Sequence, residues 1–213
     1  MDAFCIASGY LVGCINPAYI ISRIQGYDIR DKGTGNAGAT NIGLQSGIGY
    51  GIVALALDIL KAFLATILPG KLGRSAVVAA FTGIACIVGH IFPFWLGFRG
   101  GKGTACVIGF GLALKPLLIL PVTVLAMLLS KPIGATTFAP VFAAIIMAVY
   151  YAVFEGTVPM CLLMIALALI LLIPRRQELL HIRKNKQNRD PSLWVSPLKL
   201  KEEYKKRANK QVK

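Results

Sequence analysis

The chain has 213 residues, of which 56% are hydrophobic and 15% charged, and its mean hydropathy of +0.67 excludes an ordinary soluble domain. The net charge is +14, and residues 175–213 carry nine of these positive charges. Next to apolar segments, such a basic stretch favours a cytoplasmic tail that contacts anionic lipid headgroups over a tail that binds nucleic acid. The five cysteines lie in apolar stretches without paired spacing, which indicates neither a disulfide framework nor a zinc site.

Apolar runs that are long enough for a helix to cross a bilayer recur along the chain. They predict an all-α, polytopic membrane protein with about seven transmembrane helices and cytoplasmic glycine-rich loops. The expected spans, in chain order, are Phe4–Ile24, Gly47–Leu68, Ser75–Phe92, Ala105–Leu114, Pro116–Leu129, one that ends near Phe154, and Val158–Ile173.

The fourth and fifth of these spans are short, and residues 105–129 could instead form one kinked span. The distribution of basic residues favours two. With seven spans and an outer N-terminus, the loops around Arg30 and Lys102 face the same side as the basic tail, as the positive-inside rule requires. We therefore expect a bacterial inner-membrane protein with a cytoplasmic C-terminus, a transmembrane domain over residues 1–188 and a basic tail over 189–213.

The first polar loop follows the first span and holds Asp31-Lys-Gly-Thr-Gly-Asn-Ala-Gly-Ala-Thr-Asn41. Its G-x-G-x-x-G pattern would indicate a dinucleotide fold only after a strand, and here a membrane span precedes it. Closely spaced glycines still let backbone N–H groups approach an anion, and a following helix N-terminus adds positive potential. An ordinary turn-rich loop is the alternative. The pattern's glycines are Gly33, Gly35 and Gly38, and its neutral donors are Thr34, Asn36, Thr40 and Asn41.

The second polar loop ends in Gly101-Lys102-Gly103-Thr104, which resembles the end of a Walker A motif. It departs from that motif twice, because glycine follows Lys102 and Leu96 stands where the leading glycine is required. These departures argue against an ATPase. A lysine between glycines, with Arg99 close by, nevertheless suits a phosphate dianion.

Three ionisable residues lie inside predicted spans. Asp58 and Lys61 are three residues apart, and an i, i+3 ion pair is favoured over a catalytic role. His90 could act as a general base or cap its span through a backbone hydrogen bond. The sequence shows no G-x-S-x-G elbow, no activated cysteine and no metal-ligand spacing, so acyl transfer would depend on positioning and an activated donor. Gly43, Gly47 and Gly51 recur every four residues, which predicts close helix packing.

The motif from Gly33 to Asn41, together with Gly89-His-Ile-Phe-Pro and Gly100-Gly-Lys-Gly-Thr-Ala105, resembles the acylphosphate-dependent glycerol-3-phosphate acyltransferases of bacteria. The resemblance extends over about residues 4–185. It implies seven spans around a cytoplasm-facing site, acyl phosphate and glycerol 3-phosphate as substrates, and no cofactor or metal. It also implies attack of the 1-hydroxyl on the acyl-phosphate carbonyl without a protein general base, which leaves a substrate phosphate to take the proton.

The resemblance assigns site residues by position. Lys102 matches the family's phosphate-binding lysine, Thr34 stands where the family usually has serine, and with Asn41 they form the expected catalytic set. The third cytoplasmic segment and the C-terminal motif are looser matches. The expected substrate-binding residues are Gly33, Gly35, Asn36, Gly38, Thr40, His90, Arg99, Gly101, Gly103, Thr104, Lys131, Thr137, His181 and Asn185.

Two positions depart from the family pattern. Leu44 occupies the place of an arginine, which removes a bidentate phosphate anchor that Arg30, Arg99 or a tail residue would have to replace. His181 and Asn185 are four residues apart instead of three, so aligning Asn185 puts Ile182 where histidine belongs. The alternatives are a divergent paralogue for another phosphorylated acceptor and a membrane transport or assembly protein, although no inverted repeat supports transport.

Overall fold

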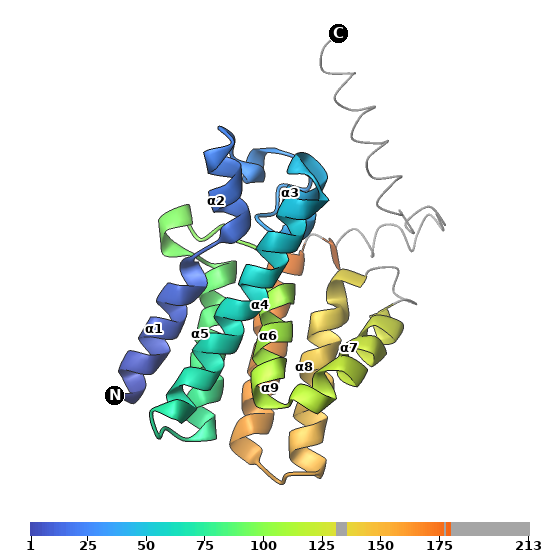
Figure 1. Ribbon diagram of the computed structural model, residues 1–213. Helices are drawn as coiled ribbons and strands as arrows, with labels where there is room; N and C mark the ends of the chain where they lie inside the picture. The colour runs from blue at the N-terminus through green and yellow to red at the C-terminus, as the bar shows by residue number, and fades with distance from the viewer. Residues whose placement is uncertain (131–135, 177, 180–213) are drawn as a thin grey trace.

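The computed structural model describes residues 1–130, 136–176, 178 and 179, and the regular secondary structure of this part is helical (Figure 1). The all-α membrane fold predicted from the sequence is confirmed. The α-helices are α1 (Asp2–Cys14), α2 (Pro17–Ile24), α3 (Ala39–Ser46), α4 (Ile48–Lys71), α5 (Ala76–Ile91), α6 (Thr104–Leu114), α7 (Pro116–Ser130), α8 (Ala139–Val153) and α9 (Val158–Leu172).

Among the described residues, five helical segments are long and apolar enough, by length and composition, to cross a membrane, and α6 and α7 are apolar but shorter. Seven crossings therefore remain a prediction. The five segments are Asp2–Ile24, Ile48–Lys71, Ala76–Leu96, Thr136–Val153 and Val158–Arg175.

Proline explains two interruptions of the helices. Residues 105–129 form two helices instead of one kinked helix, because Pro116 has no backbone N–H and disfavours helical geometry at Lys115. The chain turns there, and α7 runs back towards the other end of the molecule (Figure 1). The first predicted span is also broken, since α1 ends at Cys14 and α2 begins at Pro17 after the N-cap residue Asn16.

Glycines set the closest approaches between helices. A Cβ on Gly13 of α1 would clash with the backbone of Cys86 on α5, and Gly109 of α6 lies equally close to α4. Gly43 and Gly51 also pack against each other, as their spacing predicts. The prediction for Gly47 is wrong, because this residue connects α3 to α4 with a φ of 111° and has nothing packed against it.

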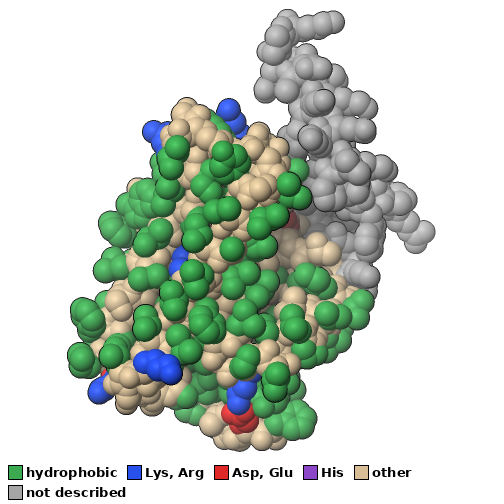
Figure 2. Space-filling model, in the orientation of Figure 1, with side chains coloured by type: hydrophobic (Ala, Val, Ile, Leu, Met, Phe, Trp, Pro, Cys, Tyr) green, Lys and Arg blue, Asp and Glu red, His purple; other side chains and the backbone are tan. Residues whose placement is uncertain are grey.

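On the face shown in Figure 2, hydrophobic side chains cover much of the surface between the two ends, and most of the visible Lys and Arg side chains lie towards the ends. This surface suits a lipid environment, in which apolar residues face outwards. The two polar loops, between α2 and α3 and between α5 and α6, lie at the same end as the C-terminus of α9 (Figure 1). The N-terminus lies at the opposite end.

Candidate active site

The first polar loop is built around the side chain of Asn41, which is fully buried. Its Nδ2 atom donates to the carbonyl oxygens of Ile29, Lys32 and Asn36, each at 3.0 Å, and its Oδ1 atom accepts from the N–H of Thr34 at 3.1 Å. A single amide therefore satisfies four backbone groups of this loop, which includes the short 3-10 helix Ile29–Asp31. Asn41 shapes this loop from the inside.

The open face of the same loop carries the other predicted donors. Gly33 and Gly35 have φ values of 58° and 70°, in the left-handed region that favours glycine. The side chains of Thr34 and Thr40 are exposed. The predicted helix N-terminus is present, since Gly38 is the N-cap of α3. The loop thus presents hydroxyl groups beside the N-terminus of a helix, where an anion is favoured.

The second polar loop folds back on the end of α5. The N–H groups of Gly100 and Gly101 donate to the carbonyl oxygens of Ile91 and His90, both at 3.0 Å. Gly103 then turns the chain with a φ of 78° and acts as the N-cap of α6. The loop therefore ends, like the first one, at a helix N-terminus.

The two loops touch each other. A Cβ on Gly101 would lie 2.9 Å from the carbonyl oxygen of Ala37, so the second loop packs directly against the first. Asn16 donates to the same carbonyl oxygen at 3.0 Å. Farther along, the Nη1 atom of Arg30 donates to the carbonyl oxygen of Leu96 at 2.8 Å. The expected convergence of these two segments is present in the structure.

Arg175 connects the second loop to the third polar segment. Its fully buried guanidinium donates to the carbonyl oxygen of Thr137 at 2.6 Å, to that of Leu171 at 2.6 Å, and to the hydroxyl of Thr104 at 3.1 Å. Two predicted site residues, Thr104 and Thr137, are thereby brought together. The sequence interpretation counted Arg175 only as a charge of the basic stretch. Its place directly after an apolar span was the signal that could have identified it.

Lys102 lies between the glycines of the second loop and forms an ion pair with Glu178, beyond the end of α9. Its side chain is 27% exposed, so the ammonium remains within reach of a ligand. Arg99, the other basic residue of this loop, is exposed. Three further predicted residues, Lys131, His181 and Asn185, lie outside the described residues, as does the basic tail.

Leu44 stands where the family pattern has an arginine, and its surroundings show which basic residues could replace that arginine. Leu44 is half-buried and lines a groove of about 820 Å³ between α3 and α4. Arg30 is already engaged, because its Nη2 atom lies 2.7 Å from a carboxylate oxygen of Asp28 and its guanidinium stacks over Tyr19. Hydrogen bonding between the two groups lowers the pKa of Asp28 and raises that of Arg30. Of the two candidate replacements in the described part of the chain, Arg99 is the more accessible.

A buried ionic cluster lies beneath the loops. The Nζ atom of Lys61 is 2.8 Å from Oδ1 of Asp58 and 3.0 Å from Nδ1 of His90, which confirms the predicted ion pair within α4. Nδ1 of His90 is also 3.2 Å from Asp58, and its ring is 3% exposed. Cys106 completes a group of potential metal ligands within 4.8 Å of one another. The Lys61 ammonium already supplies positive charge to this group.

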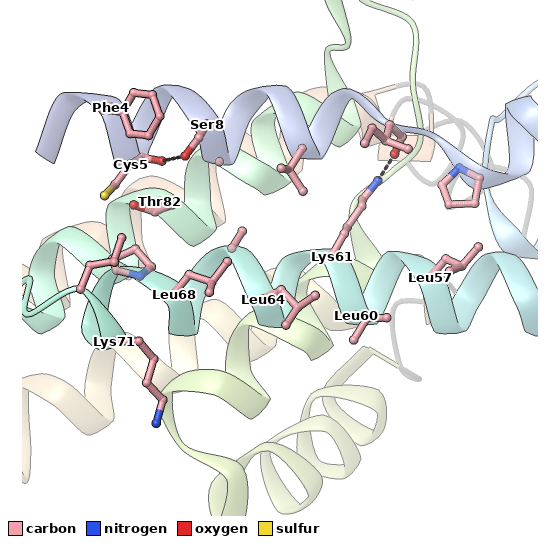
Figure 3. Close-up of a pocket in the computed structure, with 17 residues that line it drawn as sticks. Phe4, Cys5, Ser8, Leu57, Leu60, Lys61, Leu64, Leu68, Lys71 and Thr82 are labelled. Carbon is pink, nitrogen blue, oxygen red and sulfur yellow. Dashed lines mark hydrogen bonds between the residues drawn. The ribbon is translucent and has the colours of Figure 1, made fainter. Parts of the chain in front are cut away.

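Another apolar groove among the described residues lies elsewhere, between α1 and α4, with a volume of about 540 Å³ (Figure 3). Phe4, Leu57 and Leu64 line it, and Lys61 crosses it from α4 to α1. None of the predicted loop residues lines this groove. It is therefore separate from the polar end of the molecule.

The chain is similar in sequence to known proteins over most of its length. Residues 3–185 match the family described as glycerol-3-phosphate acyltransferase. The chain is 38% identical over 144 residues to the glycerol-3-phosphate acyltransferase of Trichlorobacter lovleyi, covering 68% of this chain and 74% of that protein. It is 31% identical over 183 residues to the enzyme of the same name from Geobacter sulfurreducens, covering 86% of this chain and 94% of that protein.

Two solved structures share the fold. The crystal structure of an integral membrane glycerol 3-phosphate acyltransferase in its glycerol 3-phosphate form matches with a TM-score of 0.76 and 27% identity, over 86% of this chain and 92% of that one. The lysophosphatidic acid form of an enzyme of the same name matches with a TM-score of 0.75 and 26% identity, over 93% of this chain and 97% of that one.

Proposed function

Because the chain belongs to the glycerol-3-phosphate acyltransferase family, we propose that it transfers an acyl group from acyl phosphate to the 1-hydroxyl of glycerol 3-phosphate. The products are lysophosphatidate and phosphate, and the reaction belongs to phospholipid biosynthesis. The observation that carries the proposal is the meeting of two glycine-rich loops, each ending at a helix N-terminus, with Lys102 in one of them. Such a site suits two substrates that both carry phosphate.

In this reaction the oxygen of the acceptor's 1-hydroxyl forms a bond to the acyl carbon, and the bond from that carbon to the phosphate oxygen breaks. The hydroxyl proton leaves with the released phosphate. Acyl phosphate is already activated, so the protein need supply only positioning and charge neutralisation. Lys102 would exchange its contact with Glu178 for a phosphate dianion, and backbone N–H groups at the start of α6 would add donors.

The remaining site residues fall into two groups. Thr34, Thr40 and Arg99 are exposed and contact substrate directly in our proposal. Asn41 and Arg175 are buried, and they hold the loops that carry the contacting groups. Lys131, His181 and Asn185 keep their proposed roles in phosphate binding on the strength of the sequence resemblance.

We place the site at the cytoplasmic face of a bacterial inner membrane, with the N-terminus outside. The basic excess of residues 175–213 supports this orientation. Residues 1–188 would form the membrane domain, and residues 189–213 would lie against anionic lipid headgroups.

Leu44 favours a second candidate, a divergent enzyme that acylates another phosphorylated acceptor. An apolar side chain in a groove cannot bind phosphate as a guanidinium does. The same acyl transfer would then act on an acceptor whose phosphate is bound without the arginine that Leu44 replaces.

Phosphate release from palmitoyl phosphate by the purified, detergent-solubilised protein tests both candidates. We expect release that depends on glycerol 3-phosphate and accompanies lysophosphatidate formation. Lys102→Ala should lower turnover at least about a hundredfold, as loss of a charge-stabilising group does. The matched control is Lys71→Ala, at the exposed end of α4, which should retain full turnover.

Full activity in Lys102→Ala would refute the proposed phosphate site. Folded protein that is inactive with glycerol 3-phosphate but active with another phosphorylated polyol would select the second candidate.

A further inference from the structure

Lys61 compensates for the break between α1 and α2. Its Nζ atom donates to the carbonyl oxygen of Gly13 at 3.1 Å and to that of Ile15 at 2.5 Å. Figure 3 shows Lys61 reaching from α4 to α1 across the groove between them. The last carbonyl groups of a helix have no partner within the helix, and hydrocarbon offers none. A cation at this end also complements the helix dipole. One buried ammonium thus allows α1 to end inside an apolar segment.

The break in turn positions the first loop. Asn16, fully buried at the break, accepts from the N–H of Tyr19 at 2.9 Å and so caps α2. Its Nδ2 atom donates to the carbonyl oxygen of Ala37, between Asn36 and Gly38 of the first loop. A change in the path of the chain at Asn16 would therefore shift the loop that presents Thr34.

The same ammonium reaches the second loop through His90. Nδ1 of His90 lies 3.0 Å from Lys61, and the carbonyl oxygen of His90 accepts from the N–H of Gly101. Gly101 leaves no room for a larger residue, because a Cβ there would clash with Nε2 of His90. Lys102 is the next residue. The His90 ring, which Lys61 contacts, therefore helps to set the position of the Lys102 backbone.

We propose that Lys61 is a positioning residue that fixes the two phosphate-binding loops relative to each other, with Asp58 as its counter-charge. The proposal rests on the function proposed above, in which each loop binds a phosphate group. Lys61 itself lies below the loops and does not touch substrate. Contacts of 2.5–3.2 Å within the cluster join α4 and α5 to the end of α1. The hydrogen bonds of Asn16 to Ala37 and of Gly101 to His90 continue from there to the two loops. The effect of the cluster is therefore on the spacing of the loops and not on the reacting atoms.

The test uses the double variant Asp58→Asn/Lys61→Met, which removes both charges and so leaves no unpaired ion in the core. We expect folded protein whose kcat/KM for glycerol 3-phosphate falls at least about tenfold, because small misplacements of binding groups are costly to rate. A rise in KM should carry part of this fall. Lys71→Met, on the exposed end of the same helix, is the matched control and should leave both constants unchanged.

Hydrogen exchange supplies a readout that does not depend on activity. In the double variant, amides of residues 33–41 and 97–103 should exchange faster, whereas those of α8 and α9 should not. Asn16→Ala removes the cap of α2 and the link to Ala37 but leaves the contacts of Lys61 with Asp58 and His90 in place, so it should accelerate exchange in the first loop and not in residues 97–103.

Unchanged exchange in both loops and unchanged KM would overturn the positioning role, whatever the acceptor. If the double variant does not fold, the exchange measurement on Asn16→Ala replaces it. Wild-type protection of the first-loop amides from exchange in that variant would also overturn the positioning role. A wild-type protein without acceptor-dependent turnover would refute the proposed function only, because the exchange experiment would still measure how the loops are held.

Discussion

Two buried side-chain amides hydrogen-bond to backbone groups at the polar end of the molecule. Asn41 satisfies four backbone groups of the first loop, and Asn16 joins that loop to the start of α2. Backbone groups that are buried without a partner are costly, and a polar loop packed against membrane helices contains many of them. With these groups satisfied from within, the exposed hydroxyls of Thr34 and Thr40 remain available to a ligand.

Adjacent residues of α3 should therefore respond differently to substitution. Asn41→Ala leaves three carbonyl oxygens and one N–H without their partner, and should lower the free energy of unfolding by about 1–3 kcal/mol or more, together with activity. Thr40→Ala removes an exposed hydroxyl, so it should lower activity about tenfold or less and leave stability within about 0.5 kcal/mol.

Thermal unfolding in detergent, followed alongside turnover, separates the two effects. Equal loss of stability in both variants would contradict the proposal that Asn41 stabilises the loop whereas Thr40 contacts substrate.

At the scale of helices, packing depends on glycines that let backbones approach. Gly13 places α1 against α5 at the point where α1 ends, and Gly109 places α6 against α4. Both pairs support the polar end, since α1 leads into the break at Asn16 and α6 begins at Thr104, two residues after Lys102. Close approach of helices in a membrane depends on small residues of this kind.

A pair of glycine substitutions tests this packing. Gly13→Ala places a methyl group against the backbone of Cys86, which cannot move aside without moving α5, and should destabilise the protein by about 1–3 kcal/mol. Gly49→Ala is the matched control, because nothing lies within 4 Å of a Cβ there. It should be neutral or stabilise α4 by up to about 1 kcal/mol.

The unfolding midpoint of each variant in detergent is the measurement. A stable Gly13→Ala protein would show that α1 and α5 do not depend on this close approach.

At the scale of the whole molecule, ion pairs occur at both ends, and the basic stretch distinguishes the loop end. The end opposite the loops carries Arg74–Asp2 and Lys115–Glu155, and the loop end carries Arg30–Asp28 and Lys102–Glu178. Hydrogen bonding within the Lys115–Glu155 pair lowers the pKa of Glu155 and raises that of Lys115. The loop end is continuous with the basic stretch, which supports a cytoplasmic location for it.

Labelling of single cysteines tests this orientation. In a background without the five native cysteines, Arg99→Cys at the loop end and Lys71→Cys at the opposite end both place a thiol at an exposed position. A membrane-impermeant maleimide should label the Lys71→Cys protein in intact bacterial cells, and the Arg99→Cys protein only after permeabilisation. The reverse pattern would place the loops, and the proposed site, outside the cell.

Local patterns in the sequence were enough to predict the helical membrane fold, the polar loops and the turn before Pro116. Apolar run length, proline and glycine act on the residues next to them, so their effects can be recognised without tertiary structure. The Asp58–Lys61 ion pair was predictable for the same reason, because one turn of helix brings its partners together. Membership of the acyltransferase family could also be predicted, since its two glycine-rich motifs are continuous in sequence.

Tertiary structure decided which side chains hold the site and which can meet a substrate. Four-residue spacing could not show that Gly47 connects two helices instead of packing within one. The links from Lys61 to His90 and from Arg175 to Thr104 join residues 29 and 71 positions apart. Asn41 was predicted as a catalytic donor, yet its amide is turned inwards to the loop backbone. Such partners are selected only when helices pack, because burial forces each polar group to find whichever complementary group lies nearest in space.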